Sequence, residues 1–121
     1  MALIKSVEGR LELPIIGAPM LTAASKATVI AQCKSGIIGA FPALAARPQS
    51  EFENWITEIE DALAEHDAAN PSRKAAPYAA NLIVHHSNSR QAEDLETCIR
   101  RKVPVILTSV GASWDLVKEV H

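Results

Sequence analysis

Short apolar runs alternate along this chain with longer segments whose apolar positions recur every three to four residues. The apolar runs have the length of strands, and the longer segments have the spacing of amphipathic helices. The four predicted strands are Leu13–Met20, Ile37–Phe41, Tyr78–Val84 and Val103–Thr108. Nearly continuous apolar strands separated by one-faced helices are typical of a parallel sheet, because parallel strands need crossover connections and are buried on both faces. The sequence therefore predicts an α/β fold with the order β-α-β-α-β-α-β-α.

The first predicted helix covers Lys26–Lys34, with Ser25 as its expected N-cap and Gly36 just beyond its end. Its narrow apolar face is expected at Ala27, Ile30 and Ala31. Small residues on this face would allow the helix to lie close to the sheet. Residues 1–12 precede the pattern and are interpreted as a lead-in that covers the bottom of the sheet.

The second predicted helix begins at Ser50 and is the most clearly amphipathic. Ser50 and Glu53 have the spacing of a capping box, in which each side chain bonds the backbone N–H of the other. The expected apolar face consists of Phe52, Trp55, Ile56, Ile59 and Leu63. The acidic residues expected to face away are Glu53, Glu58, Glu60 and Glu65.

Two further helices are predicted after the third and fourth strands. Asn88 and Gln91 repeat the capping-box spacing, and the helix that follows ends at Arg100–Lys102, where cations suit the negative end of the helix dipole. Its expected sheet-facing residues are Ala92, Leu95 and Ile99. The apolar residues of the last helix are Leu116, Val117 and Val120.

Composition narrows the class of protein. Twelve basic residues stand against 14 acidic ones, and no basic block suggests nucleic acid or an anionic membrane as a partner. No segment approaches the roughly 20 apolar residues of a membrane span, and no signal-peptide pattern begins the chain. Cys33 and Cys98 lie far apart in helical patterns and are expected to be reduced, buried thiols. These features predict a soluble, cytoplasmic protein.

Three stretches carry a resemblance to a known family, and they are Pro14–Met20, Asn81–His85 and Val103–Ser109. They resemble the first, third and fourth barrel strands of the nitronate monooxygenase family, also called the 2-nitropropane dioxygenase family, whose members are FMN-dependent TIM-barrel oxidoreductases. A complete (β/α)8 barrel typically needs about 250 residues. The resemblance therefore implies that residues 1–121 form one partial domain, the N-terminal (βα)4 half of a flavin-binding barrel.

The resemblance also implies where FMN binds. Backbone groups of Ala18 and Pro19 would contact the isoalloxazine ring, and the Met20 side chain would pack beside it. Asn81 would lie against the ring from the third strand. From the residues alone, Met20 is better explained as a core methionine, and Asn81 is equally explained as a buried amide that bonds neighbouring backbone.

Other polar residues follow the strand ends. Thr108, Ser109 and Gly111 could reach a ligand through hydroxyl or amide groups, although an ordinary turn into a helix explains them equally well. His85 and His86 could bind an anion or take a proton, or only solvate a loop. As neighbours in a strand they would point to opposite faces, which argues against a shared metal ion. The family's catalytic histidine corresponds to a segment beyond His121, so no catalytic residue is assigned.

The implied function is the oxidation of nitronates or nitroalkanes, small-molecule substrates, with dioxygen to a carbonyl product and nitrite. A flavin-dependent enoyl reductase of the same barrel type is one alternative. Another is a non-catalytic half-barrel that self-associates, because an open sheet leaves two apolar edges that favour a homo-oligomer. A flavodoxin-like domain is disfavoured, since Pro19 and Met20 stand where a phosphate-binding helix N-terminus would need glycine, serine or threonine.

Overall fold

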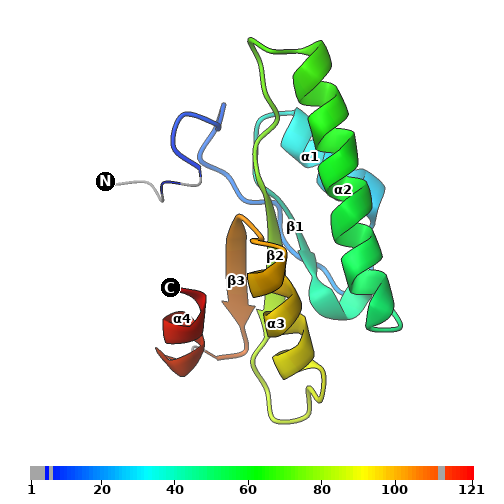
Figure 1. The fold of residues 1–121 in the computed structure, drawn as a ribbon, viewed down its shortest axis with the longest axis vertical. Coiled ribbons are helices and arrows are strands. Elements are labelled where there is room, and N and C mark those ends of the chain that lie inside the picture. Colours follow the sequence, from blue (N-terminus) through cyan, green and yellow to red (C-terminus); the bar gives the residue numbers. More distant parts are fainter. Residues whose placement is uncertain (1–4, 6, 112–113) are drawn as a thin grey trace.

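Three parallel strands form the central sheet of the computed structural model, which describes residues 5, 7–111 and 114–121. The strands are β1 (Gly39–Pro42), β2 (Tyr78–Ile83) and β3 (Val105–Ser109), and they lie in the order β1-β2-β3. The helices are α1 (Lys26–Lys34), α2 (Ser50–Ala69), α3 (Gln91–Arg100) and α4 (Trp114–Val120), with a 3-10 turn, η1, at Ala43–Ala45. The predicted α/β class with an open parallel sheet is confirmed (Figure 1).

The first predicted strand, Leu13–Met20, is not a regular strand. A single parallel bridge joins Ile16 to Ile38 beside β1. Pro14 and Pro19 lack the N–H groups that a longer ladder needs, which limits the pairing. The expected burial is also wrong, since Ile15 and Ile16 remain 48% and 46% exposed.

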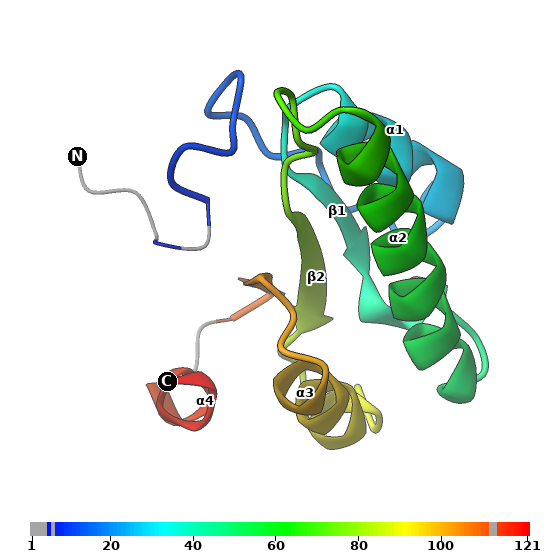
Figure 2. The ribbon, with the colours of Figure 1, turned by 45° about the horizontal axis from the view of Figure 1, so that its top comes forward.

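The two faces of the sheet carry different clusters. Phe41 and Leu82 belong to the main hydrophobic core, which they share with α1, α2 and α3. Ala40 and Ala79 belong to a second, smaller cluster that includes Val7 of the lead-in. Neighbouring residues of a strand point to opposite faces, so the sheet separates the two clusters. Figures 1 and 2 show α1 and α2 together beside one face, with α3 next to β2. Residues 1–4 and 6 of the lead-in lie outside the described part.

Helix α1 has the predicted bounds and cap, but its buried face differs from the prediction. The Thr28 N–H donates to Ser25 Oγ at 3.1 Å, as expected of an N-cap. Val29 and Cys33 are buried and Ile30 packs against the main core as predicted, whereas Ala27 and Ala31 are exposed. The small residue that permits close packing is on the strand instead.

Gly39 of β1 is the residue that allows this close approach. A Cβ atom at Gly39 would collide with Val29 O and lie 2.9 Å from Cys33 Sγ. Gly36, which has a φ of +91°, ends the helix in the left-handed conformation that glycine adopts readily. Two glycines thus determine how α1 ends and how closely it packs on β1.

Helix α2 buries the predicted apolar face. Phe52, Ile56 and Ile59 are fully buried. The predicted capping box does not form, because Gln49 is the N-cap and its side chain makes no capping hydrogen bond. Glu53 is instead drawn toward α3.

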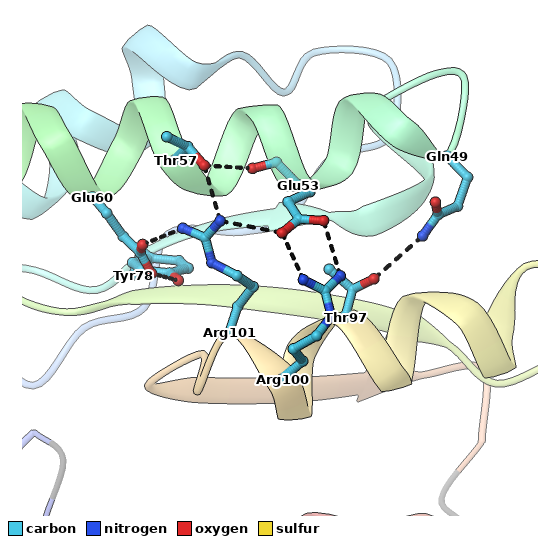
Figure 3. Close-up of polar contacts among 8 residues, drawn as sticks. All are labelled: Gln49, Glu53, Thr57, Glu60, Tyr78, Thr97, Arg100 and Arg101. Atoms are coloured by element: carbon cyan, nitrogen blue, oxygen red, sulfur yellow. Dashed lines mark hydrogen bonds and ion pairs between the residues drawn. The ribbon is translucent and has the colours of Figure 1, made fainter.

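A network of ion pairs joins α2 to α3 (Figure 3). Arg100 donates to both carboxylate oxygens of Glu53, at 2.7 and 2.9 Å, and this bidentate pair holds the pKa of Glu53 down at about 2. Arg101 donates to Glu60 at 2.6 Å, and the Tyr78 hydroxyl donates to the other oxygen of Glu60 at 2.7 Å. Burial and this carboxylate raise the pKa of Tyr78. Glu58 also pairs with Lys26 of α1 at 2.6 Å. The prediction that Glu53, Glu58 and Glu60 face away is therefore wrong.

Helix α3 also differs in its buried face and its cap. Leu95 and Cys98 are buried as part of the main core, whereas Ala92 and Ile99 are exposed. Asn88 forms no capping box, since its side chain donates to Ile83 O at 2.9 Å and accepts from the Arg90 N–H at 3.1 Å. Arg90 is the N-cap residue, without a side-chain capping hydrogen bond.

Candidate functional site

Asn81 and Ser109 meet at the carboxyl end of the sheet. Asn81 is only 4% exposed, and its Nδ2 donates to Ser109 Oγ at 3.1 Å. The strand register pairs Asn81 with Leu107, two residues before Ser109, so both polar side chains lie on the same face of the sheet. Among the described residues none donates a hydrogen bond to Asn81 Oδ1. The pair therefore offers an amide oxygen to a ligand at the edge where α/β folds bind ligands.

The segment Ala18–Met20 ends at the same edge. Ile16 bridges to Ile38 of the neighbouring strand segment. Met20 lies four residues after Ile16, and Pro42 lies four residues after Ile38 and pairs with Asn81. Met20 is 56% exposed, and its carbonyl accepts from Ala24 N at 2.9 Å in the turn that leads to α1. Ala18 is exposed and Pro19 is half-buried. Met20 is therefore not a core methionine, and its side chain is free to contact a ligand.

Thr108 is not brought to this face. It is the strand neighbour of Ser109 and pairs with Leu82, whose side chain belongs to the main core under the helices. Adjacent strand residues alternate between faces, so Thr108 lies on the helix side. The structure brings Asn81 and Ser109 together and leaves Thr108 apart from them.

Val110 and Gly111 shape the exit from β3. Val110 has a φ of 68°, a left-handed conformation that is strained for a β-branched residue. At Gly111 a Cβ atom would lie 3.3 Å from Val84 O, so a close approach of the β2 and β3 ends explains this glycine. The strained residue directly follows Ser109 at the candidate site.

His85 and His86 lie beyond the end of β2, which stops at Ile83. Their ring centroids are 4.0 Å apart with an interplanar angle of 38°, so the prediction that they point to opposite faces is wrong. The strand alternation does not apply because the turn has already begun at these residues. Ser87 N donates to His85 Nδ1 at 3.2 Å. Among the described residues no group of three or more metal-ligating side chains is found.

Arg90 and Asp94 form a buried ion pair that the sequence analysis missed. Arg90 Nη2 lies 3.0 Å from Asp94 Oδ1, and Arg90 also donates to the carbonyls of Ala46 and Ala43 at 2.8 and 3.2 Å. Asp94 is 1% exposed, and its burial raises its pKa. The i,i+4 spacing of Arg90 and Asp94 was the available signal. The pair fixes the loop after β1 against the start of α3, on the helix side of the sheet.

Two cavities among the described residues lie away from the candidate site. One of about 650 Å³ lies between the lead-in and the end of α2, lined by Arg10, Glu12, Asp67 and Arg73 among others. One of about 590 Å³ lies between α3 and α4, over Leu95, Ile99 and Leu116. Neither is lined by the predicted site residues.

Both cysteines are buried, as predicted, and we expect them to be unreactive in the folded protein. Burial raises the pKa of Cys33 to about 11 and that of Cys98 to about 12, which leaves very little thiolate at neutral pH. A chromogenic thiol reagent should modify them at least about 100-fold more slowly in buffer than in denaturant, because modification requires opening of the core. An Ala68→Cys variant places a thiol on an exposed position of α2 and serves as the reactive control. Equal rates for native and added thiols would contradict the expectation.

Among the described residues no helix is long and apolar enough to cross a bilayer. Comparison of the chain with protein-family models, with curated proteins and with solved structures gives no match.

Proposed function

We propose that this chain is the N-terminal (βα)4 half of a TIM barrel and forms one wall of the FMN ring site of a cytoplasmic oxidoreductase of nitronate monooxygenase type. The observation that carries the proposal is the hydrogen-bonded pair of Asn81 and Ser109 at the carboxyl edge of a parallel sheet, with the exposed Met20 in the segment that follows the bridge beside β1. Active sites of such barrels lie at this edge. The resemblance of the strands to that family supports the same placement.

The residues at this edge fit a flavin ring better than they fit its phosphate. An isoalloxazine ring needs hydrogen-bond partners at its nitrogens and oxygens and an apolar surface elsewhere. Asn81 supplies an amide oxygen that accepts no hydrogen bond from the described residues, and Met20 supplies the apolar contact. Under the resemblance, the phosphate and the catalytic histidine belong to segments beyond His121. Bound FMN would supply the redox chemistry with dioxygen, and this chain would hold and orient the ring.

A visible absorption spectrum of the purified protein, followed by titration with FMN, tests this proposal. We expect flavin absorption or quenching of FMN fluorescence. Asn81→Ala should weaken FMN binding about tenfold, the effect of one lost hydrogen bond of about 1.4 kcal/mol. Met20→Ala should also weaken it without disturbing the fold, because Met20 is 56% exposed. Asn54→Ala is the matched control, since Asn54 is exposed on α2 and its side chain donates to Glu51 at 2.9 Å, away from the candidate site.

A colourless protein that leaves FMN fluorescence unchanged would contradict flavin binding. Circular dichroism of Asn81→Ala separates a lost contact from a lost fold, because Asn81 is buried. A flavin-dependent enoyl reductase would use the same ring wall. Turnover of a nitronate against turnover of an enoyl thioester by a flavin-loaded sample distinguishes these two reactions.

The second candidate function is a non-catalytic half-barrel that self-associates. The exposure of apolar residues at both edges of the sheet favours it, with Ile16 beside β1 at 46% and Val110 directly after β3 at 71%. Monomeric proteins rarely leave such residues together on the surface. Light scattering during size-exclusion chromatography tests self-association directly, and a uniform species of 13.0 kDa would contradict it.

A further inference from the structure

Exposed apolar residues gather at two opposite ends of the molecule. We call the first group the β1-side edge, and it consists of Leu13, Ile15, Ile16, Met20 and Leu21. We call the second group the β3-side edge, and it consists of Val110, Trp114, Val117 and Val120. Ile15 and Ile16 are neighbours on an extended segment and are 48% and 46% exposed, so the described residues cover neither face of that segment.

The backbone at the β1-side edge is also unpaired on its outer side. Ile38 N donates to Ile15 O at 3.0 Å, and Gly17 N donates to Ile38 O at 2.8 Å. The N–H and C=O of Ile16 therefore point away from β1, and they have no partner among the described residues. At the opposite end of the sheet, β3 pairs with β2 on one side only. Each end thus presents an apolar strand edge that can accept another strand.

We infer that a second copy of this chain covers both edges, with the β1-side edge of each copy paired to the β3-side edge of the other around a twofold axis. All strands of one copy run parallel, so a twofold axis along the strand direction keeps them parallel across both joints. One kind of contact, used twice, then closes the ring and leaves no free edge. This inference rests on the self-association proposed above and not on flavin binding.

The register of the sheet indicates which residues meet at each joint. Ile16 pairs with Ile38, and the registers of β1, β2 and β3 make Ile38 level with Pro77 and Val103. An eight-stranded barrel of shear 8 shifts the register by about four residues over half its circumference. Four residues after Val103 is Leu107, which lies within β3. An even shift preserves the face, and both Ile38 and Leu107 belong to the second cluster, so Ile16 of one copy meets Leu107 of the other.

The helices at each joint are complementary in shape. In the closed ring, α4 of one copy lies beside α1 of the other. Trp114 and Val117 project from α4 with 81% and 39% of their surface exposed. Ala27 and Ala31, one turn apart on α1, are exposed and small. Large side chains of one helix can therefore enter the shallow groove over the alanines of the other.

The same helices are complementary in charge. Helix α1 contains Lys26 and Lys34 and no acidic residue. Helix α4 contains Asp115 and Glu119 with a single Lys118. Lys26 already pairs with Glu58 of α2 at 2.6 Å, and Asp115 pairs with Lys118 at 3.7 Å, so Lys34 and Glu119 supply the charge difference between the two helices. This difference favours the pairing of α1 with α4 over contact between two copies of the same edge, which would place like charges together.

Disulfide cross-linking without added flavin tests the arrangement. In a variant that carries both Ile16→Cys and Leu107→Cys, mild oxidation should give a covalent dimer of twice 13.0 kDa that a reductant reverses. Within one copy these two positions are separated by β1 and β2, about 14 Å at the spacing of strands, which is too far for a bond. Each single variant should remain uncross-linked. Cys33 and Cys98 do not interfere, because they are buried.

A charge-reversal pair on α1 provides a second readout that needs no cysteine. Ala31→Glu and Ala31→Lys both place a long side chain in the groove, but only the glutamate opposes the acidic residues of α4, so Ala31→Glu should raise the dimer dissociation constant at least about tenfold more than Ala31→Lys. A dimer that the double variant does not cross-link would overturn the edge pairing while leaving self-association intact. A dimer cross-linked by Ile16→Cys alone would overturn it in favour of like edges meeting. A monomer would overturn both proposals.

Discussion

Replacing Ile56 with alanine is expected to lower the free energy of unfolding by about 2–5 kcal/mol. Ile56 is fully buried in the main core, where α2 packs on the sheet beside Phe41 and Phe52. The substitution removes buried methyl groups and leaves a cavity that the close-packed surroundings fill only in part. Denaturant unfolding followed by circular dichroism measures the effect as a lower midpoint with an unchanged slope.

Ile99→Ala is the matched control for this loss. The same side chain is removed from a helix, but Ile99 is 43% exposed on α3. Its loss should cost less than about 1 kcal/mol. Equal losses at the two positions would mean that the main core is not packed around Ile56.

Removing the guanidinium of Arg90 is expected to have the second largest effect, a loss of about 3–5 kcal/mol in the free energy of unfolding at neutral pH. Arg90→Ala leaves the Asp94 carboxylate buried without its cation. It also removes the donors to the carbonyls of Ala43 and Ala46. Breaking a buried pair by removing one member is costly because the remaining charge stays desolvated.

The loss should depend on pH. Burial raises the pKa of Asp94 above its unfolded value, and Arg90 opposes this rise. In Arg90→Ala the folded-state pKa should rise further. A raised pKa means that the folded variant tolerates Asp94 better when it is protonated. The variant therefore keeps its full stability below the pKa of Asp94 in the unfolded chain, about 3.9, and loses stability as the pH rises through the pKa of Asp94 in the folded protein. The deficit of Arg90→Ala relative to the parent protein should therefore be smaller near pH 4 than at neutral pH.

Two controls separate charge from packing in this experiment. Adding Asp94→Asn to Arg90→Ala removes the buried charge and should restore part of the stability at neutral pH. Arg73→Ala breaks the exposed pair with Glu12 at 3.3 Å and should cost no more than about 1 kcal/mol. A deficit for Arg90→Ala that is unchanged across this pH range would mean that the Asp94 charge does not cause it.

Helix positions were predictable from sequence, while the faces of the short helices were not. The buried residues of α2 follow from five apolar positions at helical spacing in a 20-residue helix. Helix α1 has only nine residues, many of them small, and its orientation depends on Gly39 of the neighbouring strand. The capping boxes failed for a related reason, since Glu53 finds arginines of α3 that only the tertiary fold brings near it.

The candidate site was predictable where its residues lie in regular paired strands, because side chains there alternate between the two faces of the sheet. Asn81 and Ser109 lie in strands, and the parallel register places them on one face. The histidine pair lies past the strand end, where alternation gives no information. The Arg90 contacts join residues more than 40 positions apart, and no local pattern predicts which carbonyls a guanidinium will reach.

The order of the strands in the sheet is the same as their order along the chain. Each strand therefore finds its pairing partner in the strand synthesised just before it, and none must wait for a segment made later. During translation the structure can grow by one strand and one helix at a time, with every intermediate presenting a single growing edge. The same topology permits whole strand-helix units to be gained or lost at the ends of the gene without a change in the strand order or connections of the remaining units.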